Sequence, residues 1–175
     1  MALTLLIGGA RSGKSDAAIA MASRWGGSVV FVATAEARDE EMTERIARHK
    51  ASRPNEWTTI ETGDLGSALS AAPDDAFVIV DCLTLWMSRF MERELSDDDI
   101  HTVVREAADA AAARPAPTVA ITNEVGSGIV PDNQLARRFR DLLGGANRTW
   151  ADAADRTLLV VAGRALRLSS IEELT

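Results

Sequence analysis

Leu-Thr-Leu-Leu-Ile-Gly-Gly-Ala-Arg-Ser-Gly-Lys-Ser, residues 3–15, is the stretch of sequence that decides the fold. Its first five residues predict a buried strand, and its last eight match the pattern G-x-x-x-x-G-K-S of phosphate-binding loops. The glycines let successive backbone N–H groups turn inward around a phosphate, and the N-terminus of the following helix adds partial positive charge. Strand, loop and helix follow in the order that the motif requires, so the sequence predicts a site for a nucleoside triphosphate.

Lys14 and Ser15 carry the chemistry of this loop. A lysine at this position reaches the β- and γ-phosphates, and the serine hydroxyl is a ligand for Mg²⁺. The apolar run Phe77–Asp81 ends in a carboxylate, which is the natural second ligand of the ion, directly or through water. Asp81 as a cap of the helix that begins at Leu83 is the alternative, and the residues alone leave it open.

Short apolar runs alternate with longer helical patterns along the rest of the chain. The runs are continuously apolar, which is typical of strands covered on both faces, and the alternation predicts a parallel sheet with helices on both faces. The expected strands are Leu3–Ile7, Ser28–Ala33, Trp57–Glu61, Phe77–Val80, Thr118–Thr122 and Thr157–Ala162. The expected helices are Lys14–Arg24, Arg38–Lys50, Leu83–Glu92, Asp97–Ala113 and Asn133–Leu143, with Gly144-Gly145 as a break after the last. The sequence therefore predicts a single three-layer α/β domain over residues 1–175.

Composition narrows the function classes. The 175 residues are 46% hydrophobic and 26% charged, close to the globular average, which excludes disordered and fibrous classes. A net charge of −7 argues against nucleic acid or an anionic membrane surface as a partner. No segment reaches the apolar length of a membrane span, and a single cysteine, Cys82, fits a reducing compartment. We therefore expect a soluble, cytoplasmic protein.

His49 is the second candidate for chemistry because it lies in a cluster of basic residues. On a helix it follows Met42 and Ile46 along one apolar stripe, so an ordinary place at the edge of the core is one interpretation. Nearby cations would disfavour protonation of the imidazole and keep it in the neutral form that attacks phosphorus. They would also attract a polyphosphate, and on the residues alone both interpretations stay open. These cations are Arg45, Arg48, Lys50 and Arg53.

Several blocks of sequence together resemble the bifunctional adenosylcobinamide kinase / adenosylcobinamide-phosphate guanylyltransferases of cobalamin synthesis. The blocks are Gly8–Ser15, Arg45–Trp57, Val80–Trp86, Thr122–Pro131, Arg138–Gly144 and Val160–Gly163. The similarity covers nearly the whole chain in order. Its main departure is Gly163-Arg164-Ala165-Leu166, where the family usually has glycine, leucine or isoleucine, proline and leucine.

The resemblance implies a RecA-like P-loop fold, a homotrimer and two reactions. Adenosylcobinamide is first phosphorylated with ATP or GTP, and GMP is then transferred from GTP through a guanylyl-histidine to give adenosylcobinamide-GDP. His49 and Lys14 are the implied catalytic residues, and Ser15 and Asp81 are the implied ligands of Mg²⁺. The implied nucleotide contacts are Gly8, Gly9, Ala10, Arg11, Ser12, Gly13, Lys14, Ser15, Ala33, Thr34, Ala35, Lys50, Ala51, Ser52, Arg53, Glu61 and Asp81.

Two other function classes remain as alternatives. A kinase-only enzyme acting on another small alcohol would leave His49 structural, and a nucleotide-gated binding protein would transfer nothing. Residues 123–126 depart from the N-K-x-D motif of guanine-specific switches, which argues against a GTPase switch. Glu124 orients a substrate hydroxyl or only shapes a turn, and we expect Trp57 and Trp86 to pack in the core rather than line a corrinoid surface.

Overall fold

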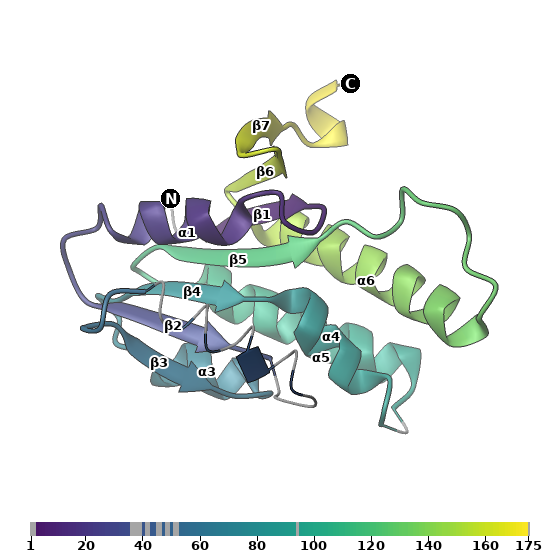
Figure 1. Cartoon of the computed structure of the whole chain (residues 1–175), viewed down its shortest axis with the longest axis horizontal. Coiled ribbons are helices and arrows are strands. Elements are labelled where there is room, and N and C mark those ends of the chain that lie inside the picture. The colour runs from purple at the N-terminus through teal and green to yellow at the C-terminus, as the bar shows by residue number, and fades with distance from the viewer. Residues whose placement is uncertain are drawn as a thin grey trace.

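The computed structural model describes residues 3–35, 40, 43–44, 47, 50, 53–93 and 95–174. Within these residues a seven-stranded sheet carries helices on both faces, in the order β3-β2-β4-β5-β1-β6-β7 (Figure 1). Neighbouring strands are parallel except for the antiparallel pair β6–β7. The strands are β1 (Leu3–Gly8), β2 (Val29–Ala33), β3 (Thr58–Glu61), β4 (Phe77–Asp81), β5 (Thr118–Asn123), β6 (Arg156–Val161) and β7 (Arg164–Leu168). The helices are α1 (Lys14–Ala22), α3 (Leu65–Ala71), α4 (Leu83–Phe90), α5 (Asp97–Ala112), α6 (Gln134–Ala153) and the 3-10 helix η1 (Ile171–Leu174).

Successive residues of the central strands face two separate cores. Leu5 and Val80 belong to a core that α3, α4, α5 and α6 cover, whereas Phe31 and Ile79 belong to a core on the face of α1. A strand buried on both faces has no position for a solvated side chain, which explains the continuously apolar runs. The packing brings the carboxyl ends of β1, β2, β4 and β5 to one edge of the sheet, where such folds bind their ligands.

The helix α6 is where the prediction was wrong. Gly144 and Gly145 lie inside this helix, which continues from Leu143 to Ala153. A Cβ on Gly145 would lie 3.1 Å from His101 Cε1, so the glycine permits close packing of α5 against α6. Burial of Leu143 and Trp150 on the same helix outweighs a propensity cost of about 1 kcal/mol for each glycine.

Other predicted elements are confirmed with boundaries shifted by a few residues. The helix expected over Arg38–Lys50 lies largely outside the described residues. Three elements were missed: α3, β7 and the 3-10 helix η1. The sequence did hold a signal for α3, because Asp64 accepts a hydrogen bond from the backbone N–H of Ser67 and caps the helix.

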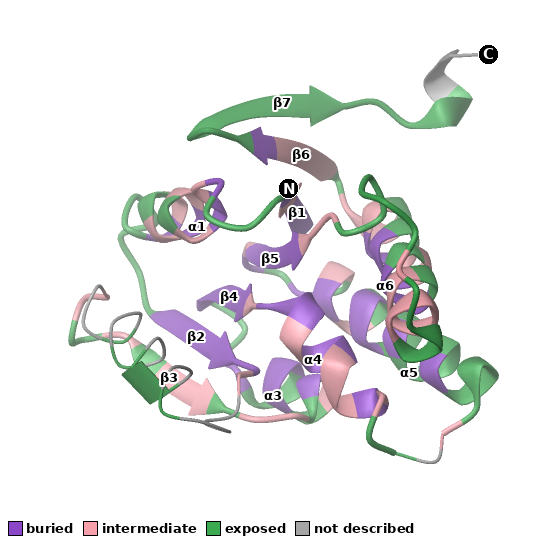
Figure 2. Cartoon of the chain, turned by 45° about the vertical axis from the view of Figure 1, so that its right-hand side comes forward, coloured by how far each residue is buried: buried purple, intermediate pink, exposed green. Residues whose placement is uncertain are grey.

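The hairpin β6–β7 forms one margin of the sheet, where β6 pairs in parallel with β1 and β7 is the edge strand. Its two-residue turn, Ala162 and Gly163, has φ angles of 50° and 71°, the positive values that tight hairpins require. All five residues of β7 are exposed, in contrast to the buried strands at the centre of the sheet (Figure 2). The strand β7 therefore buries little apolar surface against its own chain, whereas Val160 on β6 lies in the core on the face of α1.

Candidate active site

The phosphate-binding loop, residues 8–15, joins the end of β1 to α1. Lys14 is only 7% exposed, and its Nζ donates hydrogen bonds to the carbonyl oxygens of Gly8 at 3.0 Å and Gly9 at 2.7 Å. The same nitrogen lies 3.3 Å from Ser12 Oγ. Gly13 has a φ of 98°, which glycine accepts without strain. The loop thus wraps around a buried ammonium at the position where the motif receives a phosphate chain.

Ser15 and Asp81 meet beside this loop, although 66 positions separate them in the chain. Ser15 Oγ donates a hydrogen bond to Asp81 Oδ2 at 3.0 Å. The N-cap of α4 is Cys82, so the alternative in which Asp81 caps that helix is wrong. In nucleotide sites Mg²⁺ is held by one or two protein oxygens and by the phosphates, and an adjacent hydroxyl and carboxylate fit that chemistry.

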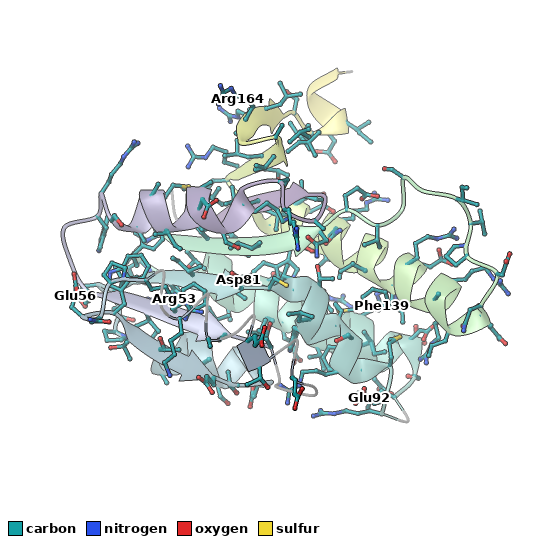
Figure 3. The ribbon with its side chains drawn as sticks, in the orientation of Figure 1. Arg53, Glu56, Asp81, Glu92, Phe139 and Arg164 are labelled. Carbon is teal, nitrogen blue, oxygen red and sulfur yellow. The ribbon has the colours of Figure 1, made fainter. Side chains whose placement is uncertain are left out.

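Arg53 brings a further positive charge to the same edge of the sheet. Its guanidinium lies over the ring of Phe31, 3.4 Å from the ring centroid, and Figure 3 labels it together with Asp81. Two of its nitrogens, Nε and Nη1, are buried without a hydrogen-bond partner among the described residues. Burial lowers the pKa of Arg53, while the negative charges of Asp81 and Glu61 act in the opposite direction. Buried donor nitrogens on a partly buried cation are costly when they lack acceptors, and a bound polyphosphate would supply acceptors.

Lys50 and Glu61 form an exposed ion pair at the end of β3. Lys50 Nζ lies 3.7 Å from Glu61 Oε1, and both side chains are more than half exposed. A pair in this environment contributes little to stability. Both charges therefore remain accessible to a nucleotide.

Thr34, at the end of β2, has a role that the sequence did not reveal. It is buried, its hydroxyl donates to the Cys82 carbonyl at 2.7 Å, and it accepts from the Cys82 N–H at 2.9 Å. The Thr34 N–H donates to the Asp81 carbonyl at 3.2 Å. These bonds fasten β2 to the end of β4 and so position Asp81. A nucleotide contact from Ala33, Thr34 or Ala35 stays a prediction.

Glu124 begins the segment between β5 and α6. Its backbone N–H donates to the Gly8 carbonyl at 3.1 Å, which places this segment directly beside the phosphate loop. Its carboxylate accepts hydrogen bonds from the Gly126 N–H and the Ser127 hydroxyl. The structure thus shows Glu124 shaping a turn.

A buried polar network holds the end of β5 and was also missed. Thr122 Oγ1 donates to Asn147 Oδ1 at 2.7 Å, and Asn147 Nδ2 donates to the Asn123 carbonyl at 3.1 Å. The Asn123 N–H donates to Thr84 Oγ1 at 2.8 Å. The only signal in the sequence was the presence of polar residues on helix faces that are otherwise apolar. The network links α4, β5 and α6 and fixes the strand end next to the phosphate loop.

Several predicted site residues lie outside the described residues: His49, Ala51 and Ser52, with the neighbouring cations Arg45 and Arg48. Trp86 is buried, and its Nε1 donates to the Gly63 carbonyl at 3.0 Å, which confirms its place in the core. Trp57 packs against the core on the face of α1. Burial raises the pKa of the Cys82 thiol to about 11, so this cysteine is an unreactive core residue.

The chain is similar to a known family of enzymes and to solved structures that share its fold. The sequence pattern of the family described as cobinamide kinase / cobinamide phosphate guanyltransferase matches residues 4–168. The bifunctional adenosylcobalamin biosynthesis protein CobU of Salmonella typhimurium is 40% identical over 187 residues, covering 95% of this chain and 99% of that protein. The bifunctional adenosylcobalamin biosynthesis protein CobP of Pseudomonas aeruginosa is 39% identical over 163 residues, covering 91% and 92%. Among solved structures, the RadB recombinase matches 90% of this chain and 73% of its own with a TM-score of 0.52 at 17% identity, which confirms the predicted RecA-like fold.

Proposed function

Because the chain belongs to the cobinamide kinase / cobinamide phosphate guanyltransferase family, we propose that it makes adenosylcobinamide-GDP in two successive transfers. ATP or GTP first phosphorylates the hydroxyl group of adenosylcobinamide. GTP then gives GMP to the phosphate that has been formed. The structural observation that carries the proposal is the convergence of Lys14, Ser15 and Asp81 at one edge of the sheet.

In the first transfer the substrate hydroxyl oxygen attacks the γ-phosphorus and loses its proton to solvent, the bond to the bridging oxygen breaks, and a nucleoside diphosphate leaves with the electrons of that bond. The N–H groups of the phosphate loop bind the phosphates, and Lys14 exchanges its contacts with the Gly8 and Gly9 carbonyls for the charge that develops on the phosphoryl oxygens. Ser15 and Asp81 would hold Mg²⁺, which neutralises phosphate charge when bound.

In the second transfer we propose His49 as the nucleophile. A neutral imidazole nitrogen attacks the α-phosphorus of GTP, a P–N bond forms, and pyrophosphate leaves with the electrons of the broken P–O bond. An oxygen of adenosylcobinamide phosphate then attacks the same phosphorus and releases the imidazole. Lys50, the next residue in the chain, and Arg53 supply positive charge at the edge where Asp81 lies.

The test of both steps uses GTP radiolabelled at the α-phosphate, followed by denaturation of the protein. We expect covalent label on the wild-type chain and none on His49→Ala, while His49→Ala still phosphorylates adenosylcobinamide because Lys14, Ser15 and Asp81 are intact. The label should survive alkali and be lost in mild acid, as a phosphoramidate is. Labelling should also fall on the acid side of neutrality, since protonation of an imidazole with a reference pKa of about 6.5 removes its lone pair.

Label retained on His49→Ala would exclude His49 as the nucleophile. Phosphorylation without any label on the wild-type chain would favour the kinase-only alternative. Loss of both activities in His49→Ala would contradict the separation of the two steps.

We also propose that the chain is a cytoplasmic homotrimer, as the family resemblance implies. The exposed strand β7 supports an assembly of some kind, because Leu166 is 63% and Leu168 is 39% exposed. In the part of the chain that the structure describes, no helix combines the length and hydrophobicity of a membrane span. Light scattering measures the mass in solution, which we expect to be three times 18.7 kDa.

A further inference from the structure

The segment between β5 and α6 starts beside the phosphate loop, at Glu124, and carries apolar side chains that are exposed to solvent. Ile129 is 98%, Val130 60% and Val125 39% exposed, and Leu135 in the first turn of α6 is 54% exposed. We name these four residues the apolar platform. Single exposed apolar residues are ordinary, whereas four within eleven consecutive residues make this segment a candidate interaction surface.

The segment that carries the platform is fastened at both ends. At its start the Glu124 N–H donates to the Gly8 carbonyl. At its end the Arg137 guanidinium donates to the carbonyl oxygens of Pro131 at 2.8 Å and Asp132 at 2.7 Å. Between these ends the segment extends beyond the sheet before α6 begins (Figure 1). The two ends of the segment are therefore fixed to the rest of the chain, and the side chains of the platform face solvent between them.

One carbonyl oxygen links the platform to the catalytic lysine. The Gly8 carbonyl accepts from Lys14 Nζ at 3.0 Å and from the Glu124 N–H at 3.1 Å. Ile129 follows Glu124 by five residues, which span at most about 18 Å of chain. A molecule whose hydroxyl lies at the γ-phosphate can thus reach the platform if a large apolar body is attached to that hydroxyl.

Resting on the proposed function, we propose that the apolar platform binds the corrin ring of adenosylcobinamide while the hydroxyl arm of the substrate reaches the γ-phosphate beside Lys14. The corrin is a large macrocycle with apolar faces and an amide-bearing rim, and the reacting hydroxyl lies at the end of a flexible arm. Such a substrate needs an apolar surface outside the phosphate site but within reach of the arm. The platform is apolar and exposed, and it begins at Val125, next to the residue whose N–H donates to the Gly8 carbonyl.

The experiment compares the double variant Ile129→Ser/Val130→Ser with the wild-type enzyme. We expect the KM for adenosylcobinamide and its Kd, measured by equilibrium dialysis from the visible absorbance of the corrin, to rise roughly tenfold to a hundredfold. The KM for ATP and the covalent labelling by GTP should not change, because neither requires the corrin. Val103→Ser is the matched control, since Val103 is also exposed, at 36%, but lies on α5. Ile129→Leu, which keeps the apolar surface, should keep the wild-type KM.

Each outcome has one meaning. An unchanged KM and Kd in the double variant, with an active wild-type enzyme, overturns the corrin site and leaves the proposed function standing. A wild-type enzyme that does not phosphorylate adenosylcobinamide overturns the proposed function itself. A lower mass of the double variant by light scattering, relative to wild type and to Val103→Ser, assigns the platform to a contact between copies of the chain and overturns the corrin site.

Discussion

The phosphate loop is held from two sides, and the two sides differ in kind. On the buried side, formed by β4 and β5, polar bonds link the loop to strands covered by helices: Ser15 to Asp81, and Gly8 to Glu124. On the hairpin side, formed by β6 and β7, the Gly163 N–H donates to the Ser12 carbonyl at 2.8 Å. A Cβ on Gly13 would lie 3.3 Å from the Gly163 Cα, so the rest of that contact is close packing of bare backbone.

The two sides differ in the role that we propose for them: the buried side binds phosphates, and the hairpin side supports the loop. The charged groups that we propose to act on phosphates lie on the buried side, whereas Arg164 lies apart from Asp81 and Arg53, on the hairpin, as Figure 3 shows. The main departure from the family pattern, Arg164-Ala165, falls on the hairpin side. It therefore leaves the residues proposed for phosphoryl transfer unaltered, and it changes only a strand that is exposed along its length.

Lys14→Ala breaks the buried side and has the largest expected effect. Removal of the ammonium takes away the charge that stabilises the transferring phosphoryl group, so the rate of adenosylcobinamide phosphorylation should fall about a thousandfold. The far-ultraviolet circular dichroism should remain that of the wild type. Arg148→Ala is the charge-matched control, because Arg148 is 86% exposed on α6, and it should phosphorylate normally. A Lys14→Ala enzyme with near-wild-type rates would remove the functional assignment of the loop.

The sequence predicted the buried side well because its parts are local signals. The loop motif names Lys14 and Ser15, and a carboxylate at the end of an apolar strand names Asp81. Parallel strands bring their carboxyl ends to one edge, so the contact between Ser15 and Asp81 follows from topology. Thr34 was missed as a support of Asp81, since the partner of its hydroxyl is Cys82, which follows β4 and lies 48 positions away, and no motif encodes that pairing.

The strand β7 and the full length of α6 could not be predicted from the sequence. The strand β7 has only five residues, all exposed, so its sequence carries no core pattern to read. Gly144-Gly145 predicted a break by propensity, but the packing of α5 against α6 decides the outcome. The fold class depends on patterns repeated along the whole chain, whereas these details depend on single contacts between distant segments.

Gly8→Ala tests how closely β6 fits against the loop, with an intermediate expected effect. A Cβ on Gly8 would collide with the Val160 carbonyl oxygen and lie 3.1 Å from Ser12 Oγ. Because a backbone atom cannot rotate away, β1 and β6 must separate, and the free energy of unfolding should fall by about 2–3 kcal/mol. Urea unfolding followed by circular dichroism measures this. Gly9→Ala is the control, since no described atom lies within 4 Å of its Cβ, and a similar loss there would contradict the steric argument.

Gly163→Ala probes the hairpin turn and has the smallest expected effect. No described atom lies within 4 Å of the new Cβ, so the cost comes only from the φ of 71°, about 1–2 kcal/mol for a residue other than glycine. The N–H that donates to Ser12 is kept, so the KM for ATP should change little.

Gly144→Ala makes the same chemical change inside α6, again with no described atom within 4 Å, and should raise the free energy of unfolding by about 0.5–1 kcal/mol. If Gly163→Ala lowers the free energy of unfolding and Gly144→Ala raises it, the result supports a hairpin side that stabilises the loop through backbone geometry alone. If Gly163→Ala instead slows phosphorylation as strongly as Lys14→Ala, the hairpin side takes part in catalysis and the contrast between the two sides does not hold.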